Sequence, residues 1–318
     1  MSLAIEAEGL VKHYGSIVAL EGLDLSVPEG TVMGLLGPNG AGKTTSVRIF
    51  TTLLKPDGGW AKVSGIDVAA NAAEVRSVIG LSGQYAAVDE NLTGYENLDM
   101  IGRLYHLGKS TSRTRARELL DQFDLDEAGD RQVKTYSGGM RRRLDLAAAL
   151  VARPSVIFLD EPTTGLDPRS RIALWDVIAD LVAEGSTLLL TTHFLDEADR
   201  LADKIAVIDH GRVIALGTAD ELKSQVGGER LELTVAAPDQ IAPAASVLAA
   251  IGLGAVTIDE HTRHLTVPVS SEGETLVETL RALDLQAVKV LDLTLRRPTL
   301  DDVFMTLTGH VAEEETNQ

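Results

Sequence analysis

Short, nearly continuous apolar runs of strand length recur along the first two thirds of the chain. They lie at residues 32–37, 155–160, 187–192 and 205–209. Runs of this kind are typical of buried parallel strands, because helices cover both faces of a parallel sheet. Stretches with helical periodicity lie between or beside these runs, at residues 43–53, 111–123, 138–152, 169–184 and 194–202. The alternation predicts an α/β domain with a mostly parallel sheet.

The two ends of the chain have other patterns. Residues 5–27 alternate and turn as in an antiparallel β-meander. The composition changes at residues 225–228, and the pattern that follows has the order β-α-β-β-α-β, which is ferredoxin-like. Its elements are expected at residues 231–235, 240–251, 255–259, 264–269, 272–283 and 287–293, with Ser271 and Glu274 as a capping box and a last helix at 299–307. The expected domains are 1–224, 225–310 (a small α+β ferredoxin-like domain) and 311–318 (an acidic disordered tail).

Residues 241–258 form an uncharged segment about as long as the shortest membrane spans. Alanine and glycine dominate it, and Pro243, Gly252 and Gly254 interrupt it. We interpret it as a short helix, a glycine turn and a strand. No secretory signal is recognised at the N-terminus.

Charge and cysteine content narrow the functional classes. The 318 residues have a formal net charge of −18, which argues against nucleic-acid binding, since that requires a basic face. The absence of cysteine excludes disulfides, thiolate metal sites and a cysteine nucleophile, and it fits a reducing compartment.

The stretch "GPNGAGKTT" at residues 37–45 matches G-x-x-x-x-G-K-[ST], with an apolar strand before it and a helix pattern after it. Glycines allow backbone N–H groups to close around a polyphosphate, and the following helix N-terminus adds partial positive charge. Lys43 is expected to reach the β- and γ-phosphates, and the Thr44 hydroxyl to bind Mg²⁺. The expected ATP contacts of this loop are Gly37, Pro38, Asn39, Gly40, Ala41, Gly42, Lys43, Thr44 and Thr45.

Two carboxylates, Asp160 and Glu161, end the apolar run at 155–160. A carboxylate at a strand end that faces a phosphate loop holds Mg²⁺ in phosphoryl-transfer sites, so Asp160 is the expected magnesium partner, through water. Glu161 can polarise the attacking water or accept its proton.

The phosphate loop is followed, in order, by "SGGM" (137–140), "FLDEPTTGLDP" (158–168) and "TTHFLDEA" (191–198). Together they resemble the ATP-binding subunits of ABC transporters over residues 3–220. The resemblance implies a P-loop NTPase fold with an antiparallel β subdomain and a helical subdomain. "SGQYAAVDENLTGYENL" (82–98) and "LRRPTLDDVFMTLTG" (295–309) further resemble the daunorubicin/doxorubicin-resistance subfamily of drug and lipid exporters.

The resemblance also implies roles for single residues. Tyr14 would stack on adenine, and Gln84 would sense Mg²⁺ and contact a membrane subunit. Ser137, Gly138 and Gly139 would close on the γ-phosphate of the ATP held by a second copy of the chain. Asp167 would lie in the loop that links the two ATP sites, and His193 would contact the γ-phosphate.

This chain departs from the family pattern at Tyr136 and Met140, which stand where leucine and glutamine are usual. Ser137 is expected to cap the helix that begins there. Three arginines follow on that helix. Arg143 matches the family's arginine and is expected to help hold the loop, whereas Arg141 and Arg142 are expected to face solvent or acidic neighbours.

The sequence therefore predicts an ATPase with ATP and Mg²⁺ as cofactors, working as a homodimer with separate membrane permease subunits at the cytoplasmic face of the cell membrane. Export of a drug, an antibiotic or a lipid is the favoured function. An importer ATPase, a soluble ABC-type ATPase acting on ribosomes or DNA, and a non-catalytic binder are alternatives. The single phosphate loop, the acidic charge and the intact acidic pair weigh against the last two.

Overall fold

The computed structural model describes residues 2–83, 88–225, 229–270 and 275–309. The chain divides into two compact units. The first is Met1–Ala219 together with the segment from Leu307 onward, and the second is Asp220–Thr306.

A six-stranded sheet forms the middle of the first unit, in the order β10-β9-β3-β8-β7-β6. All neighbours in it pair in parallel except β9 and β10, so the expected sheet is confirmed. Because parallel strands end at the same edge, the C-terminal ends of β3, β8 and β7 lie side by side. The strands are β3 (Val32–Leu36), β6 (Ile79–Ser82), β7 (Val156–Asp160), β8 (Thr187–Thr191), β9 (Lys204–Asp209) and β10 (Arg212–Gly217).

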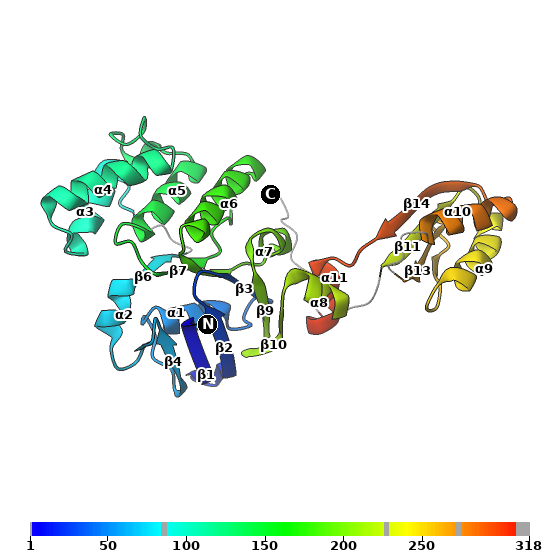
Figure 1. The fold of residues 1–318 in the computed structure, drawn as a ribbon, viewed down its shortest axis with the longest axis horizontal. Coiled ribbons are helices and arrows are strands. Elements are labelled where there is room, and N and C mark those ends of the chain that lie inside the picture. Colours follow the sequence, from blue (N-terminus) through cyan, green and yellow to red (C-terminus); the bar gives the residue numbers. More distant parts are fainter. Residues whose placement is uncertain (1, 84–87, 226–228, 271–274, 310–318) are drawn as a thin grey trace. The chain divides into compact units, whose positions relative to one another are not determined.

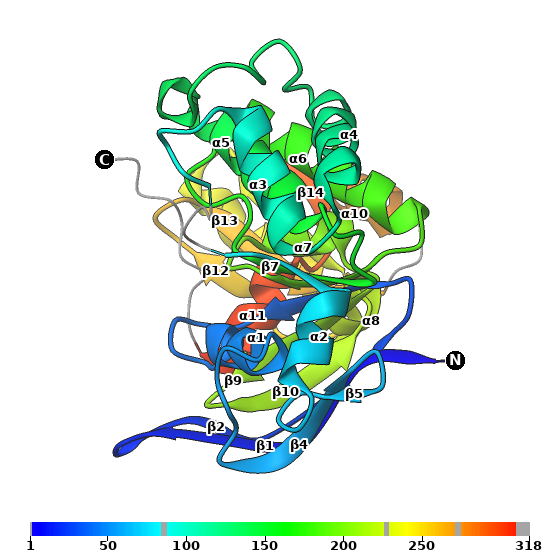
Figure 2. The same cartoon turned by 90° about the vertical axis from the view of Figure 1, so that its left-hand side faces the viewer.

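A second sheet confirms the expected antiparallel subdomain. Its order is β2-β1-β4-β5, and every pair in it is antiparallel. Figures 1 and 2 place its strands at one end of the unit and α3, α4 and α5 at the other, with β7 between. The strands are β1 (Leu3–Tyr14), β2 (Ile17–Pro28), β4 (Gly58–Val63) and β5 (Ile66–Asp67).

Helices cover both faces of the central sheet, which explains its continuous apolar runs. Along β7, Val156 and Phe158 pack with helix α1 and the antiparallel sheet, while Ile157 and Leu159 pack with the helical layer. The helices are α1 (Lys43–Phe50), α2 (Ala72–Val78), α3 (Gly94–Leu104), α4 (Lys109–Gln122), α5 (Gly138–Ala149), α6 (Pro168–Ala183), α7 (Leu195–Leu201) and the 3₁₀ turn η1 (Val133–Thr135).

The second unit has the expected β-α-β-β-α-β order, in an antiparallel sheet β12-β13-β11-β14. Leu231, Leu233, Leu265 and Val267 point from the sheet into a core shared with the helices. The expected capping residues Ser271 and Glu274 and the tail 311–318 lie outside the described residues. The elements from residue 219 onward are α8 (Ala219–Gln225), β11 (Arg230–Val235), η2 (Pro238–Gln240), α9 (Ile241–Ile251), β12 (Thr257–Asp259), β13 (His264–Pro268), α10 (Thr275–Leu285), β14 (Val290–Arg296) and α11 (Leu300–Thr308).

The uncharged segment at 241–258 therefore contains α9 and the start of β12, as expected. Within the described ranges, no helix combines the length and the apolar character that crossing a bilayer requires.

Candidate active site

The phosphate loop connects β3 to α1, and its shape depends on glycine. A Cβ on Gly37 would lie 2.2 Å from the Ile208 carbonyl oxygen, so no side chain fits between the loop and β9. Gly40 and Gly42 have φ of +82° and +112°, a region that favours glycine. No side chain caps the N-terminus of α1 at Gly42. The helix dipole and the first-turn N–H groups of α1 are therefore directed at the loop, as a phosphate site requires.

Lys43 is buried under this loop. Its Nζ donates to the Gly37 carbonyl at 2.6 Å and to the Pro38 carbonyl at 3.1 Å. The ammonium thus holds the loop in its curved form from inside. Its position, at the N-terminus of α1, suits a cation that pairs with the terminal phosphates of a nucleotide.

Thr44, Asp160 and Thr191 bring three oxygens together beside the loop. Thr44 Oγ1 lies 3.4 Å from Asp160 Oδ1, and Thr191 Oγ1 donates to the same carboxylate oxygen at 2.5 Å. Asp160 is 6% exposed and Thr191 is fully buried. Hydroxyl and carboxylate oxygens are the ligands that Mg²⁺ takes, so the residues present fit a magnesium ion bound with the nucleotide.

Glu161 turns away from strand β7 in a left-handed conformation, with φ of +52°. Its N–H donates to the Thr191 carbonyl at 3.0 Å and contacts the Thr191 hydroxyl at 3.2 Å. Its carboxylate lies 3.8 Å from Nδ1 of His193, which follows β8, and accepts from the Thr164 hydroxyl at 3.5 Å. The structure therefore brings the predicted base and the predicted γ-phosphate ligand together.

The Ser137 motif opens helix α5. Ser137 caps the helix, as expected: its hydroxyl accepts from the Met140 N–H at 3.2 Å. Nothing lies within 4 Å of a Cβ built on Gly138, so the backbone there is open to a ligand. A Cβ on Gly139 would lie 2.7 Å from the Ser170 hydroxyl of α6. The second glycine thus permits close packing of α5 on α6.

Asp167 caps helix α6. Its carboxylate accepts from the N–H groups of Arg169 and Ser170 and, at 2.6 Å, from the Ser170 hydroxyl. These bonds, the Ser170 hydroxyl first, hold the pKa of Asp167 below its usual value. Through Ser170, the loop that carries Asp167 touches the Ser137 motif of the same chain.

The two departures from the family pattern both pack into the helical subdomain. The Tyr136 hydroxyl donates to the Ala128 carbonyl at 2.8 Å. It occupies the space that a Cβ on Gly94 would need, at 2.3 Å. Met140 packs, partly buried, against the same core. Tyrosine and methionine therefore serve packing here.

Arg142 meets an acidic neighbour, Asp145, at 3.5 Å, but it does not face solvent: its side chain is only 11% exposed and binds backbone carbonyls behind Glu161. Arg141 forms the expected contact with an acidic neighbour, Glu90, at 3.0 Å. Arg143 donates to the Phe123 carbonyl at the end of α4, at 2.9 Å. Sequence spacing predicts that the three side chains diverge, but not which buried groups each one meets.

Tyr14 ends β1 and is 43% exposed, which suits an aromatic ring available for stacking. It pairs with Ile17 across the turn to β2. Two residues further along β2, the Ala19 carbonyl lies 2.7 Å from a Cβ built on Gly42. This turn therefore lies close to the phosphate loop. Gln84 falls outside the described residues.

Thr191 is a site residue that sequence reasoning missed. The signal was available, since a hydroxyl ends the leucine run of this strand two residues before the predicted His193. Position alone does not show that the hydroxyl turns towards the neighbouring strand β7.

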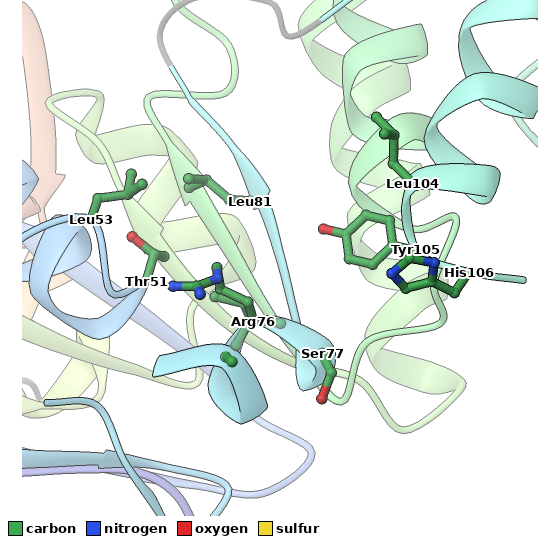
Figure 3. Close-up of a pocket in the computed structure, with 10 residues that line it drawn as sticks. Thr51, Leu53, Arg76, Ser77, Leu81, Leu104, Tyr105 and His106 are labelled. Carbon is green, nitrogen blue, oxygen red and sulfur yellow. The ribbon is translucent and has the colours of Figure 1, made fainter. Parts of the chain in front are cut away.

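A pocket of about 480 Å³ opens elsewhere on this unit, beside strand β6. Figure 3 shows Leu104, Tyr105 and His106, which come from the end of α3, on one side of it, and Thr51, Leu53 and Arg76 on the other. Leu53 and Leu104 are 65% and 69% exposed. Strand β6 forms its floor with Ile79 and Leu81, three residues before Gln84.

Comparison with known proteins finds matches to both parts of the chain. The ABC transporter family model matches residues 20–164, and the model of the ATP-binding protein DrrA1-3-like C-terminal domain matches residues 217–308. The daunorubicin resistance ATP-binding protein DrrA2 of Streptomyces coeruleorubidus is 57% identical, covering 98% of this chain and 96% of its own length. The doxorubicin resistance ATP-binding protein DrrA of Mycobacterium tuberculosis (strain CDC 1551 / Oshkosh) is 47% identical over 99% of this chain and 96% of its own.

Two solved structures share the fold. An ATP-binding subunit of an ABC transporter superposes with a TM-score of 0.64 and 29% identity, covering 70% of this chain and 93% of its own. A dimeric ATP-binding cassette in a post-hydrolysis state with ADP and Pi superposes with a TM-score of 0.62 and 25% identity, covering 67% and 98%.

The fold and the site define a P-loop ATPase of the ABC type. Both domains and nearly the full length match, so the chain belongs to the family of DrrA-like ATP-binding proteins of ABC transporters.

Proposed function

We propose that two copies of this chain bind two ATP molecules between them and couple their hydrolysis to export through a separate membrane permease. The observation that carries the proposal is the meeting of the Lys43 loop, Asp160 and Glu161 at adjacent ends of β3, β8 and β7. A binder without catalysis would not need Glu161 held beside His193.

Each ATP would lie between the phosphate loop of one copy and the Ser137 motif of the other. Two features support this arrangement: the open backbone at Gly138, and the solved dimeric cassette with ADP and Pi, which shares the fold. The N-terminus of α5 then offers a second set of N–H groups to the γ-phosphate.

Within each site, the side chains have separate tasks. Tyr14 stacks on the adenine and Lys43 pairs with the phosphates. Thr44 and Asp160, with Gln84, hold Mg²⁺, which neutralises phosphate charge. Glu161 orients the attacking water and His193 contacts the γ-phosphate. Asp167 links the two sites through the contact of Ser170 with Gly139.

The pocket beside β6 is the proposed docking place of the membrane permease. Its walls carry exposed Leu53, Leu104 and Tyr105, and concave apolar surfaces of this kind mark binding sites. It adjoins the strand that leads to Gln84, so a docked segment could act on the ATP site along β6. The chain would then lie at the cytoplasmic face of the membrane.

The exported substrate is proposed to be a hydrophobic drug, because the similar proteins named above are daunorubicin and doxorubicin resistance proteins. The test is ATP-dependent uptake of daunorubicin by inverted vesicles that contain this chain and the membrane protein encoded beside its gene.

We expect uptake with the wild-type chain and none with Glu161→Gln or Lys43→Ala. ATP hydrolysis without drug movement would contradict the proposed substrate, and the absence of hydrolysis would contradict the proposed ATPase activity.

A further inference from the structure

Arg142 connects helix α5 to the backbone of two loops behind the active site. Its Nε donates to the Pro162 carbonyl at 2.6 Å and its Nη1 to the Gly83 carbonyl at 2.6 Å. Its Nη2 reaches the carbonyls of Glu161 at 3.1 Å and Asp160 at 3.4 Å. One guanidinium therefore contacts four backbone carbonyls. Three belong to residues 160–162, which include the predicted Mg²⁺ partner and the predicted base, and the fourth belongs to Gly83, directly after β6.

The charge of this guanidinium is compensated within the fold. Arg142 Nη1 lies 3.5 Å from Asp145 Oδ2, and the Asp145 side chain is 1% exposed. Asp145 also accepts from the Ser82 hydroxyl at 2.7 Å, and Ser82 directly precedes Gly83. Burial lowers the pKa of Arg142 while Asp145 raises it. An arginine keeps its charge under such conditions, so the pair forms a stable buried link between α5 and the end of β6.

The backbone at Glu161 needs such support. Its φ of +52° is a conformation that non-glycine residues adopt only when their surroundings impose it. Thr191 fixes the N–H of Glu161, and Arg142 fixes the carbonyl of Glu161 and the next one, that of Pro162. The turn that aims the carboxylate at the site is therefore held from both sides.

We propose that Arg142 is a positioning residue for ATP hydrolysis, holding the backbone of residues 160–162 in the conformation that presents Glu161 to the attacking water. The inference rests on the proposed function of Glu161. Ser137 is the N-cap of helix α5, and Arg142 lies about 7.5 Å further along the helix, at 1.5 Å per residue. The same rigid helix thus joins the motif that meets the partner's ATP to the backbone of the chain's own base.

The experiment compares the full-length wild-type chain with Arg142→Ala, Arg142→Lys and Arg141→Ala. It measures kcat and KM for MgATP and the Kd of the fluorescent analogue MANT-ATP. Arg142→Ala should lower kcat by about tenfold or more, equivalent to about 1.4 kcal/mol of activation free energy. KM and Kd should stay within about twofold, because Arg142 binds the carbonyls of residues 83 and 160–162, whereas the loop is held by Lys43 through the carbonyls of Gly37 and Pro38.

Arg142→Lys retains a cation beside Asp145 and three donors, so its kcat should lie between those of the alanine variant and the wild type. Arg141→Ala is the matched control on the same helix. It removes an exposed ion pair with Glu90, and its kcat should stay within about twofold of the wild type.

Two results would overturn the inference: an Arg142→Ala kcat within about twofold of the wild type, or parallel losses of kcat and MANT-ATP affinity without recovery in Arg142→Lys. If the alanine variant does not fold, the kcat values of Arg142→Lys and Asp145→Asn test the inference instead. Asp145→Asn keeps an acceptor for Ser82 but removes the countercharge, and unchanged kcat in both variants would exclude a positioning role. A wild-type chain that binds MANT-ATP without turnover would instead contradict the proposed function.

Discussion

Replacing Thr191 by valine removes one hydroxyl between Asp160 and Glu161 with little change of shape. The Thr191 hydroxyl donates to the Asp160 carboxylate at 2.5 Å and lies 3.2 Å from the Glu161 N–H. A hydrogen bond to a charged group contributes about 1.5–3 kcal/mol to stability. Since one kcal/mol shifts Tm by roughly 2–4 °C in a unit of this size, Tm should fall by roughly 3–12 °C.

Turnover should fall as well, because the same hydroxyl orients the Asp160 carboxylate and binds the backbone N–H of Glu161. If about 1.4 kcal/mol of the lost interaction is expressed in the transition state, kcat decreases about tenfold. The assay is steady-state release of phosphate from MgATP, with thermal unfolding measured on the same preparations.

Thr187→Val is the matched control at the other end of strand β8. Thr187 is buried, and its hydroxyl accepts from the Gly30 N–H at 2.9 Å, far along the strand from Asp160. This variant should also lose stability, because the Gly30 N–H loses its partner, but its kcat should remain that of the wild type. Equal kcat values in the two valine variants would refute the role of the Thr191 hydroxyl.

Two further predictions concern the phosphate loop and a buried carboxyl. Gly37→Ala places a Cβ 2.2 Å from the Ile208 carbonyl, so MANT-ATP affinity should fall at least about tenfold. The fall should exceed that in Gly40→Ala, where the Cβ meets nothing within 4 Å and the φ of +82° is the sole source of strain; equal affinities would contradict this. Burial raises the pKa of Glu197, so the folded state favours the neutral carboxyl group. The wild type therefore loses stability relative to Glu197→Gln as the pH rises above 4.5, the pKa of this group in the unfolded chain. The Tm advantage of the glutamine variant should therefore be near zero at about pH 4 and clear at about pH 8, and a pH-independent difference would show that Glu197 does not titrate in this way.

The central sheet and the phosphate loop are predictable because their signals are local. Each apolar run is itself a strand, and the glycines of the loop all lie within six residues of Lys43. Helix α3 also has a local signal, a capping box in which Thr93 and Glu96 bond each other's backbone N–H groups, although periodicity alone did not place it.

Arg142 and Thr191 show what local patterns leave out. Helical spacing separates three consecutive arginines by about 100° each, but the groups that Arg142 meets come from residues 83 and 160–162. Thr191 acts across two neighbouring strands, and the strand order β3-β8-β7 is a property of the folded sheet. Their functions depend on contacts distant in sequence, which only the structure supplies.

We propose that the chain hydrolyses ATP as a dimer in which Glu161 activates water. Sedimentation of Glu161→Gln with and without MgATP tests it directly, alongside phosphate release. We predict a dimer that forms only with MgATP, holds one ATP per chain, shows no turnover, and is lost when Ser137→Ala is added. A Glu161→Gln chain that stays monomeric with ATP bound, or that hydrolyses ATP at the wild-type rate, would contradict this mechanism.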